Sequence, residues 1–250
     1  MIAKIEPPDS PLRRVLAIMP TYNECENIRL AIERVLASDD RVSLLIVDDA
    51  SPDGTGKIVE EIQAMNPRIA LMRRAGKMGL GTAYVAGFKY AIEHDYDAII
   101  EIDADLSHNP SDIPRLLKAA EDSHFVIGSR YVRGVNVINW PLQRLILSYA
   151  ASTYSRFVTG MPYTDQTAGF AVIRLEVLKE INLDRIRSNG YSFQIEIKFK
   201  AHCRGFKIVE VPIVFTERSQ GSSKMNRKIV FEAIWRVWRL RIGAVFGRML

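Results

Sequence analysis

The stretch Ile99–His108, IIEIDADLSH, joins an apolar run to two carboxylates, a hydroxyl and an imidazole. Its apolar first half is typical of a buried strand. Because alternate side chains of a strand point to the same face, Asp103 and Asp105 are predicted to lie close together on one side. Two like charges at that spacing repel each other, and a hard divalent cation such as Mg²⁺ or Mn²⁺, which prefers oxygen ligands, removes this cost. The stretch therefore predicts a strand that ends in a metal site.

The two aspartates also have a structural alternative. Aspartate commonly closes a strand or caps the next helix. Ser107 or Ser111 could provide that cap instead, which would leave both aspartates available to a cation. Spacing alone leaves both interpretations open.

Similar apolar runs recur on both sides of this stretch and alternate with amphipathic helical patterns. This alternation is typical of an α/β fold in which a mostly parallel, Rossmann-like sheet has helices on both faces. The predicted strands are residues 15–20, 42–49, 69–74, 98–105 and 125–131, and the predicted helices begin near Glu24, Thr55 and Thr82 and after Pro110.

Polar residues gather where three of these strands end, at residues 21–24, 48–53 and 103–108. Ligands of open α/β sheets bind beyond the carboxyl ends of the strands, so one cleft could collect all three groups. The second group has a strong alternative, because SPDGT is ordinary loop-to-helix sequence in which Asp53 or Thr55 caps the helix.

Two arginines are placed to bind phosphate. Arg130 directly follows the fifth predicted strand, and Arg144 lies one turn from Ser148 on a predicted helix over residues 141–157. A guanidinium group matches the oxygens of a phosphate, although an ordinary surface ion pair is the alternative for each arginine.

A basic loop and a glycine-rich segment are weaker candidates. Arg218 and Lys224, in ERSQGSSK, could close over a phosphorylated ligand or simply be solvated. The glycines of RAGKMGLGTAYVAG match neither GxGxxG nor GxxxxGKS/T, so they are interpreted as turn and helix-start glycines. The four histidines share no spacing typical of a zinc site, and His108 is expected at most to support a ligand.

The composition indicates a soluble globular protein with one domain. Of the 250 residues, 48% are hydrophobic and 25% are charged, which allows a substantial core. We expect a tail over residues 1–12, a domain over 13–223 and a basic amphipathic helix over 224–250. Cys25 and Cys203 are far apart in the sequence and are expected to be free thiols. The polar N-terminus lacks the apolar core of a secretory signal, so a cytoplasmic location is expected.

The net charge of +5 suits anionic partners such as nucleic acid, membrane phosphate or a phosphorylated substrate. Charges interrupt the C-terminal apolar segment at Glu232, Arg236, Arg239 and Arg241, so no transmembrane helix is expected. A basic helix with tryptophans can lie in a membrane interface, or its apolar face can pack against protein, and both interpretations stay open. Arg241 lies off the polar stripe and fits neither.

Ten short blocks occur in order along the chain: MPTYNE, VDDASPDGT, GLGTAYVAGF, DADLSH, GSRY, NWPLQR, DQTAGF, YSFQIE, VEVPI and ERSQGSSK. By these blocks, from about Val15 to Lys224, the chain resembles the polyprenol-phosphate (dolichyl-phosphate) mannose synthases, within the family-2 inverting glycosyltransferases of GT-A fold. Ten ordered blocks are far more specific than a lone DxD.

The resemblance implies a set of site residues. Those implied to hold the base and ribose of a nucleotide sugar are Pro20, Tyr22, Glu24, Val47 and Asp49. Those implied at the diphosphate and at Mg²⁺ or Mn²⁺ are Asp103, Ala104, Asp105 and Ser107, the last at a position where some relatives carry a glutamine ligand. Those that match the acceptor-phosphate site are Arg130, Arg144 and Ser148, and those that match a donor-side loop are Arg218 and Lys224. The implied catalytic residues are Asp103, Asp105 and Arg130. Asp165 and Gln194 match family blocks without an assigned role.

The same resemblance implies transfer of a hexose to a polyprenyl phosphate of the dolichyl or undecaprenyl type, with GDP-mannose as the expected donor. Inversion of an α-linked donor gives a β-linked polyprenyl phosphosugar. An alcohol acceptor would require a general base, whereas a phosphomonoester with a second pKa of about 6 is already largely dianionic. A divalent cation offsets the charge that grows on the leaving diphosphate. UDP-glucose or another donor stays open.

The expected partners are a nucleotide sugar, a polyprenyl phosphate and, through the C-terminal helix, the cytoplasmic face of a membrane; nucleic acid is not expected. DADLS also resembles the nucleophile loop of haloacid-dehalogenase-like phosphatases. That loop follows the first strand and needs a later GDxxxD-type motif, and the sequence has neither feature. A nucleotide-binding module without catalysis is a third class, which the joint presence of donor, metal and acceptor motifs disfavours.

Overall fold

The apolar runs form one seven-stranded sheet in the order β3-β2-β1-β4-β7-β5-β8. The computed structural model describes residues 5–6, 10–186, 188–217 and 227–245, and in the last range the side chains of 235–244. The strands are β1 (Val15–Thr21), β2 (Val42–Asp48), β3 (Ile69–Arg73), β4 (Ala98–Glu101), β5 (Phe125–Ser129), β7 (Ala171–Arg174) and β8 (Ile208–Pro212). A separate parallel pair consists of β6 (Val137–Ile138) and β9 (Phe215–Thr216).

The neighbouring strands of the large sheet are parallel except at β7. This strand runs antiparallel to β4 on one side and to β5 on the other. The remaining pairs are parallel. The prediction of a mostly parallel sheet is therefore confirmed.

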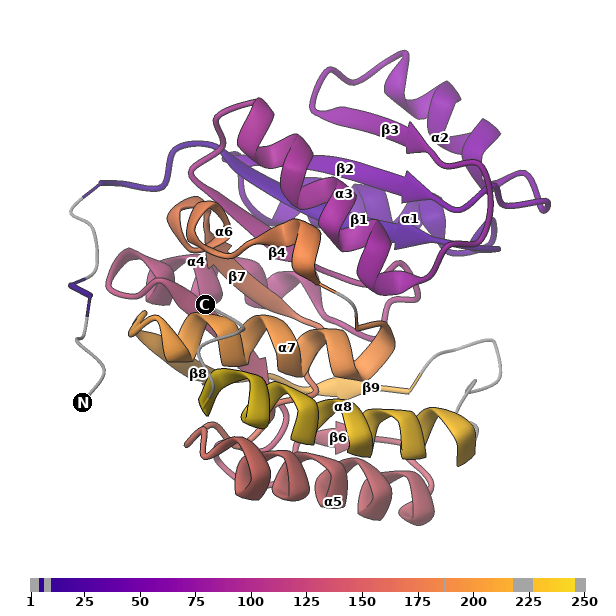
Figure 1. The fold of residues 1–250 in the computed structure, drawn as a ribbon. Coiled ribbons are helices and arrows are strands. Elements are labelled where there is room, and N and C mark those ends of the chain that lie inside the picture. Colours follow the sequence, from indigo (N-terminus) through magenta and orange to yellow (C-terminus); the bar gives the residue numbers. More distant parts are fainter. Residues whose placement is uncertain (1–4, 7–9, 187, 218–226, 246–250) are drawn as a thin grey trace.

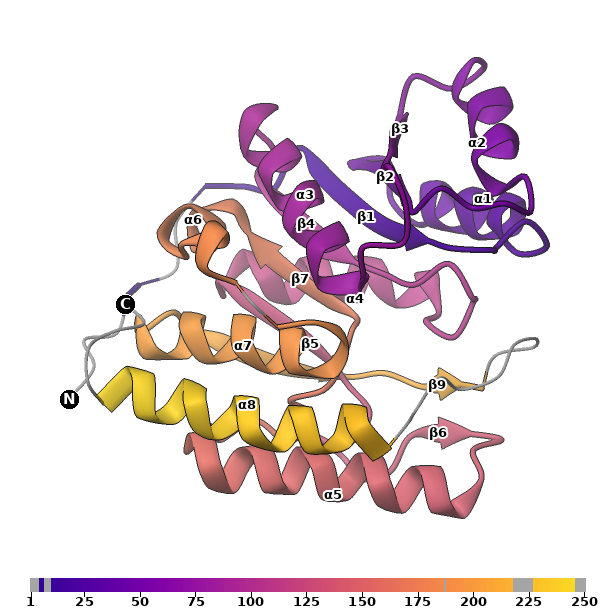
Figure 2. The ribbon, with the colours of Figure 1, turned by 45° about the vertical axis from the view of Figure 1, so that its right-hand side comes forward.

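Helices cover both faces of the sheet (Figures 1 and 2). On one face, α1, α2 and α4 contribute buried side chains such as Val35, Val59 and Leu116 to one core cluster. On the other face, α3, α6 and α7 contribute Phe88 and Phe193 to a second cluster. The helices are α1 (Ile28–Ser38), α2 (Thr55–Gln63), α3 (Leu80–Glu93), α4 (Ile113–Glu121), α5 (Leu142–Thr159), α6 (Leu175–Glu180), α7 (Gly190–Cys203) and α8 (Arg227–Val245), with short 3₁₀ turns η1 (Pro110–Asp112) and η2 (Leu183–Arg185).

Strand β4 ends earlier than the sequence predicts. The backbone N–H of Ile102 still donates to the carbonyl of Ile18 at 3.2 Å, but the chain then leaves the sheet and Leu106 has a φ of 62°. The prediction that the strand continues to Asp105 is therefore wrong. Asp103 and Asp105 share a loop, not a strand face.

Helix α1 begins at Ile28, four residues after the predicted start near Glu24. Asn23 adopts a left-handed conformation with a φ of 62°. The backbone N–H of Glu24 then donates to the Thr55 hydroxyl, and that of Cys25 donates to the Asp53 carboxylate, both at 3.0 Å. These bonds tie residues 24–25 to the start of α2, and the carbonyl of Glu24 accepts from the N–H of Ile28 at 2.9 Å in a turn that leads into α1.

Helices α5 and α8 form a layer against α7, with α8 between the other two in both views (Figures 1 and 2). Val158 of α5, Phe199 of α7, and Val237 and Leu240 of α8 belong to one small apolar cluster. Packing of the C-terminal helix against the domain, one of the two open interpretations, is thus present. The predicted domain boundary near residue 224 lies outside the described residues.

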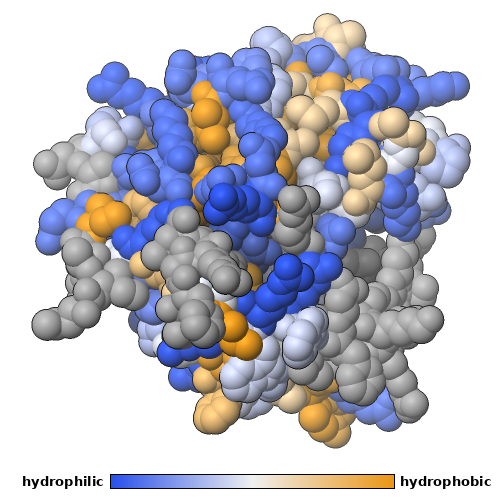
Figure 3. All heavy atoms as spheres, in the orientation of Figure 1, coloured by the Kyte–Doolittle hydropathy of each residue, from blue (hydrophilic) through white to orange (hydrophobic). Residues whose placement is uncertain are grey.

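The outer sides of α5 and α8 expose large apolar side chains. An orange group among paler ones lies at the lower edge of Figure 3, where Figure 1 places α5. Of these side chains, those exposed by at least 40% are Leu142, Ile146, Tyr149, Phe157, Trp235, Trp238 and Ile242. Arg241, which fitted neither interpretation of the helix, donates to the carbonyl of Thr159 at the end of α5 (3.4 Å). Within the described part of the chain, none of the helices has the length and apolar character required to cross a bilayer.

Candidate active site

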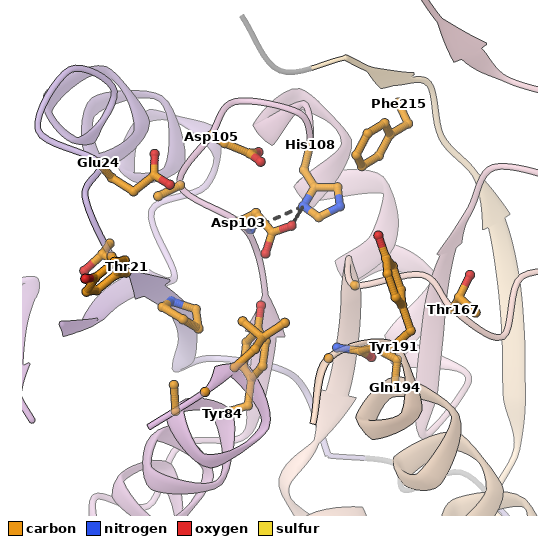
Figure 4. A pocket seen from close by; sticks show the side chains of 18 of the residues that line it. Thr21, Glu24, Tyr84, Asp103, Asp105, His108, Thr167, Tyr191, Gln194 and Phe215 are labelled. Atoms are coloured by element: carbon orange, nitrogen blue, oxygen red, sulfur yellow. Dashed lines mark hydrogen bonds and ion pairs between the residues drawn. The ribbon is translucent and has the colours of Figure 1, made fainter. Parts of the chain in front are cut away.

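A cavity of about 400 Å³ opens at the carboxyl ends of β1, β2 and β4 (Figure 4). The sheet order places β1 between β2 and β4, so the polar groups that follow these three strands meet there. The predicted site residues that line the cavity are Pro20, Tyr22, Glu24, Asp49, Asp103, Ala104, Asp105, Arg130 and Arg144.

Other predicted site residues lie elsewhere. Val47 is fully buried within β2 and is not part of the cavity lining. Ser107 and Ser148 also lie outside the lining. Arg218 and Lys224 lie outside the described residues. The roles of all five stay predictions.

The loop after β4 fixes the two aspartates by backbone hydrogen bonds. Asp105 is only 5% exposed, and its carboxylate accepts from the backbone N–H of Ser107 at 3.0 Å. The backbone N–H of Asp103 donates to Nδ1 of His108 at 3.3 Å, and the Asp103 carboxylate lies 3.9 Å from the same ring nitrogen. Ser107 keeps its hydroxyl buried, with no partner among the described residues.

His108, which is expected at most to support a ligand, lines the cavity beside Asp103 (Figure 4). Its ring stacks on Phe170 with centroids 5.0 Å apart and meets the edge of Phe215 at 5.2 Å. His108 therefore links the acidic loop to β9, and this packing sets the position of Asp103.

The acidic pair suits a hard divalent cation that takes its remaining ligands from a phosphorylated molecule and water. Asp103 and Asp105 supply two carboxylates to the same cavity. Among the residues that the structure describes, no group of three or more histidine, cysteine, aspartate or glutamate side chains could hold a metal ion. The donor set fits a shared Mg²⁺ or Mn²⁺ ion better than a metal enclosed by protein ligands.

On the side of the cavity next to β2, Asp49 organises the loop that precedes α3. Its carboxylate forms an ion pair with Arg74 and accepts from the backbone N–H groups of Met78 (3.1 Å) and Gly79 (3.4 Å). Next to it, the ammonium of Lys77 lies 4.0 Å from the ring centre of Tyr22. The geometry thus gives Asp49 a structural duty in addition to its place in the lining.

The neighbouring carboxylates of the second polar group serve the fold. Asp48 accepts from the hydroxyl of Thr21 at 3.0 Å. Asp53 accepts from both the backbone N–H and the hydroxyl of Thr55, the first residue of α2. Burial acts to raise the pKa of Asp53, but hydrogen bonds from Thr55 and Cys25 outweigh it and lower the pKa to about 2. The structural interpretation therefore holds for Asp48 and Asp53.

Two glycines let α3 begin close to the start of α7. A Cβ at Gly81 would lie 2.5 Å from the carbonyl oxygen of Ser188, and one at Gly79, where φ is 96°, would lie 2.9 Å from Asn189. The interpretation as helix-start glycines is consistent with both contacts.

On the opposite side of the cavity, Arg130 pairs with Asp165. Nε and Nη2 of Arg130 donate to the two carboxylate oxygens at 2.7 and 2.6 Å, and Nη2 also donates to Thr167 at 2.9 Å. Burial acts to raise the pKa of Asp165, but the guanidinium outweighs it and holds the pKa below its ordinary value. Asp165 is itself anchored, because its backbone N–H donates to Glu210 of β8 at 2.9 Å. Asp165 thus has a role that the sequence did not reveal, the positioning of Arg130.

Arg144 completes this basic side. It donates to Glu217 at 2.9 Å, and its guanidinium lies 4.3 Å from the ring centre of Trp140. Ser148, one turn along α5, accepts from the hydroxyl of Tyr131 at 2.8 Å. Both arginines are therefore paired, yet both still line the cavity.

A polar network that sequence reasoning missed lies under the cavity floor. Lys198 of α7 is fully buried and donates to the carbonyl of Ala168 at 2.7 Å and to Oε1 of Gln194 at 3.1 Å. Glu101, at the end of β4, is fully buried as well. Burial raises the pKa of Glu101 and lowers that of Lys198, while their opposite charges act against both shifts. A glutamate in an apolar run was the available signal, because it needs a partner when buried.

The family model described as Glycosyl transferase family 2 matches residues 16–182, more than half of the chain. The chain belongs to glycosyl transferase family 2. It is therefore a glycosyltransferase, and the haloacid-dehalogenase-like alternative is wrong.

Curated relatives of this family-2 glycosyltransferase carry specific names. It is 47% identical to polyprenol monophosphomannose synthase of Mycolicibacterium smegmatis, over 92% of this chain and 89% of that protein. It is 46% identical to undecaprenyl-phosphate mannosyltransferase of Micrococcus luteus, over 92% of this chain and 95% of that protein. Dolichol-phosphate mannosyltransferase of Pyrococcus furiosus is 35% identical over 91% of this chain and 63% of its own length. The predicted resemblance to polyprenol-phosphate mannose synthases is confirmed.

Solved structures of low sequence identity share the fold. Glucosyl-3-phosphoglycerate synthase from Mycobacterium tuberculosis, in a complex with Mn²⁺, UDP and glucosyl-3-phosphoglycerate, is 17% identical, with a TM-score of 0.60 over 95% of this chain and 80% of that one. Mannosyltransferase PcManGT from Pyrobaculum calidifontis, in complex with GDP-Man and Mn²⁺, is 16% identical, with a TM-score of 0.54 over 99% of this chain and 78% of that one. The predicted GT-A type of α/β fold is confirmed.

Proposed function

We propose that this glycosyltransferase transfers mannose from GDP-mannose to a polyprenyl phosphate, with inversion and with the help of Mg²⁺ or Mn²⁺. The observation that carries the proposal is the single cavity that has an acidic pair, Asp103 and Asp105, on one side and two arginines, Arg130 and Arg144, on the other. Such a cavity can hold two anionic groups at once, one through a cation and one directly.

The names of the relatives support the sugar and the acceptor. The two proteins of 46–47% identity are named for mannose and for polyprenol or undecaprenyl phosphate. A distant neighbour of the same fold binds GDP-Man together with Mn²⁺, and another binds Mn²⁺ with UDP. UDP-glucose is the alternative donor that the experiment below includes.

On the donor side, Asp103 and Asp105 would hold the divalent ion, which offsets the negative charge that grows on the nucleoside diphosphate as the bond to C1 breaks. Tyr22 offers its ring to the nucleotide base beside Lys77. Two hydrogen bonds keep the aspartates in place, one from the Asp103 N–H to His108 and one from the Ser107 N–H to the Asp105 carboxylate. Little reorganisation is therefore needed when the ligand binds.

On the acceptor side, Arg130 and Arg144 bind the lipid phosphate and aim one of its oxygens at C1. The phosphate is already dianionic near neutral pH, so attack requires no general base. Attack on the face opposite to the leaving diphosphate inverts the anomeric configuration. The ion pair with Asp165 fixes the guanidinium of Arg130 before the acceptor arrives, which lowers the entropy cost of binding.

The lipid itself suits the outer faces of α5 and α8. Arg144 lies on α5, the helix that also exposes Leu142, Ile146 and Phe157. Trp235 and Trp238 extend this apolar surface on α8. We propose that this surface rests on the cytoplasmic face of a membrane, so that the phosphate of a membrane lipid reaches the cavity.

A donor panel tests the proposal. The purified chain is incubated with polyprenyl phosphate in detergent and with labelled GDP-mannose, UDP-glucose or another nucleotide sugar, with and without Mg²⁺, Mn²⁺ or EDTA. We expect labelled β-linked lipid from GDP-mannose only, its loss with EDTA, and at least a thousandfold lower rate for Asp105→Asn. The matched control is Asp122→Asn, at an exposed carboxylate beyond α4. Label transfer from a different donor, or full activity of the Asp105 variant, would contradict the proposal.

A further inference from the structure

Three residues that line the cavity carry a hydrogen-bond donor without a partner in the described part of the chain. One donor is Nε1 of Trp140, whose ring lies beside Arg144, and the other two belong to α3 and α7. These two are the hydroxyl of Tyr84, on α3, and Nε2 of Gln194, on α7. Both of their side chains line the cavity, although they are only 0% and 2% exposed. In Figure 4 the Tyr84 hydroxyl points toward Asp103, and the Gln194 amide faces the same space from the opposite helix.

The ring of Tyr84 is held rigidly, so its hydroxyl cannot turn away to water. The ring stacks on Phe193 with centroids 5.7 Å apart and planes 7° apart, and it packs against Phe88 at 6.2 Å. Burial and the negative charges of Asp103, Glu101 and Asp105 raise its pKa, so the phenol stays protonated and remains a donor.

The amide of Gln194 has a fixed direction. Its Oε1 accepts from Lys198, which can only donate, and Lys198 is tied to the carbonyl of Ala168. Nε2 therefore carries the two amide hydrogens on the other side. Gln194 also lowers the pKa of Glu101, although no hydrogen bond of normal geometry joins Nε2 of Gln194 to a carboxylate oxygen of Glu101. Even with one hydrogen directed to Glu101, the second is available to a ligand.

Leaving such donors unpaired costs about 1–3 kcal/mol each, so native proteins rarely keep them without a reason. Two of them at one cavity indicate a ligand that brings acceptor oxygens to the floor. Under the proposed function, that floor lies between the acidic pair that holds the diphosphate and the arginine that holds the acceptor phosphate. The group that must lie between these two anions is the transferred hexose, whose hydroxyl oxygens accept hydrogen bonds.

We infer that Tyr84 and Gln194 bind hydroxyl groups of the transferred hexose and thereby set the sugar specificity. The inference rests on the proposed function and extends it to the sugar of the donor, for which the sequence analysis predicted no binding residues. A site built to hydrogen-bond a substrate hydroxyl rejects analogues that lack it, because its own buried donors then remain unpaired.

The test combines two variants with deoxy donors. Tyr84→Phe and Gln194→Met are assayed for kcat/KM with GDP-mannose and with its 2-, 3-, 4- and 6-deoxy analogues. The controls are Tyr90→Phe, on the same helix but outside the cavity lining, and Gln63→Met at the exposed end of α2. For each cavity variant we expect kcat/KM with GDP-mannose to fall about tenfold or more. We also expect that one of the deoxy donors, which the wild type uses less well than GDP-mannose, is used by the variant as well as GDP-mannose.

Two further measurements separate ligand contact from a structural role. Affinity for GDP, which lacks the sugar, should be unchanged in Tyr84→Phe, whereas affinity for GDP-mannose should fall. The melting temperature of ligand-free Tyr84→Phe should not fall, because the lost hydroxyl had no partner in the protein. The inference would be overturned if Tyr84→Phe had a lower melting temperature and still lost as much kcat/KM with each deoxy donor as the wild type does, while the wild type transfers mannose. A wild type that transfers no sugar from any donor would overturn the proposed function and the inference together.

Discussion

At the scale of single residues, the pair of Arg130 and Asp165 is the most consequential contact in the cavity. Asp165 is fully buried and meets the guanidinium with two hydrogen bonds. Removal of one partner from a buried pair leaves an uncompensated charge, which costs about 3–5 kcal/mol. The same removal frees Arg130 to move away from the position in which it would bind the acceptor phosphate.

We therefore expect Asp165→Asn to lower the free energy of unfolding by about 3 kcal/mol and to raise KM for polyprenyl phosphate roughly tenfold, with KM for GDP-mannose within about twofold. Urea unfolding and steady-state kinetics measure the two effects. Asp184→Asn is the control, because its carboxylate pairs with Lys89 on the exposed surface and its loss should leave the stability almost unchanged. Equal changes in both KM values would argue against a role confined to the acceptor side.

Asp53 gives a residue-level prediction that depends on pH. Its folded pKa of about 2 lies below the value of about 3.9 expected in the unfolded chain. Its contribution is therefore fully present above about pH 4 and is lost as the pH falls through the folded value. We expect Asp53→Ala to cost about 1 kcal/mol at pH 7, because its hydrogen bonds to Thr55 and Cys25 are lost, and less at pH 3.

Urea unfolding at both pH values measures this difference. Asp40→Ala, at an exposed position before β2, is the control. A stability loss that grows toward low pH would contradict the stabilising role of the ionised Asp53 carboxylate.

At the scale of elements, the start of α3 depends on close contact with the segment before α7. We expect Gly81→Ala to lower the free energy of unfolding by about 1–3 kcal/mol, because the added methyl group meets the backbone of Ser188 at 2.5 Å. The control is Gly76→Ala, where an added Cβ has no neighbour within 4 Å and φ is not in the left-handed range. Since Tyr84 lies one turn further along α3, Gly81→Ala should also lower kcat/KM with GDP-mannose. Equal stability of the two variants would show that the contact can relax.

The strands and helices up to β5 could be predicted because each carries its own periodicity. The reversed direction of β7 could not, since an apolar run such as Ala171–Arg174 has the same pattern in either direction. The true end of β4 depends on the turn at Leu106, which the apolar run did not reveal. In the site, Asp103 and Asp105 were found from local spacing, whereas Lys198 becomes part of it only through the packing of α7 under the sheet.

At the scale of the whole molecule, the apolar surface of α5 and α8 predicts binding to vesicles. We expect the double variant Phe157→Ser with Trp235→Ser to bind vesicles of anionic lipid at least tenfold more weakly in a sedimentation assay, because both side chains are at least 70% exposed. Transfer to a long polyprenyl phosphate in vesicles should fall in parallel, while transfer to a short soluble analogue should not.

Met65→Ser is the control, because Met65 is 78% exposed just after the end of α2, away from these helices. Unchanged vesicle binding in the double variant would mean that this surface serves another purpose.

Arg144 and the exposed Ile146 are two residues apart on one helix, so the distance between the phosphate-binding group and the apolar surface is set by the helix itself. Under the proposed function, the enzyme need not pull its acceptor out of the bilayer. Its velocity would then follow the mole fraction of acceptor within the lipid layer, not the amount per volume of buffer. Addition of inert phospholipid at constant acceptor would slow the reaction by two-dimensional dilution, and the finished glycolipid would depart sideways without entering water.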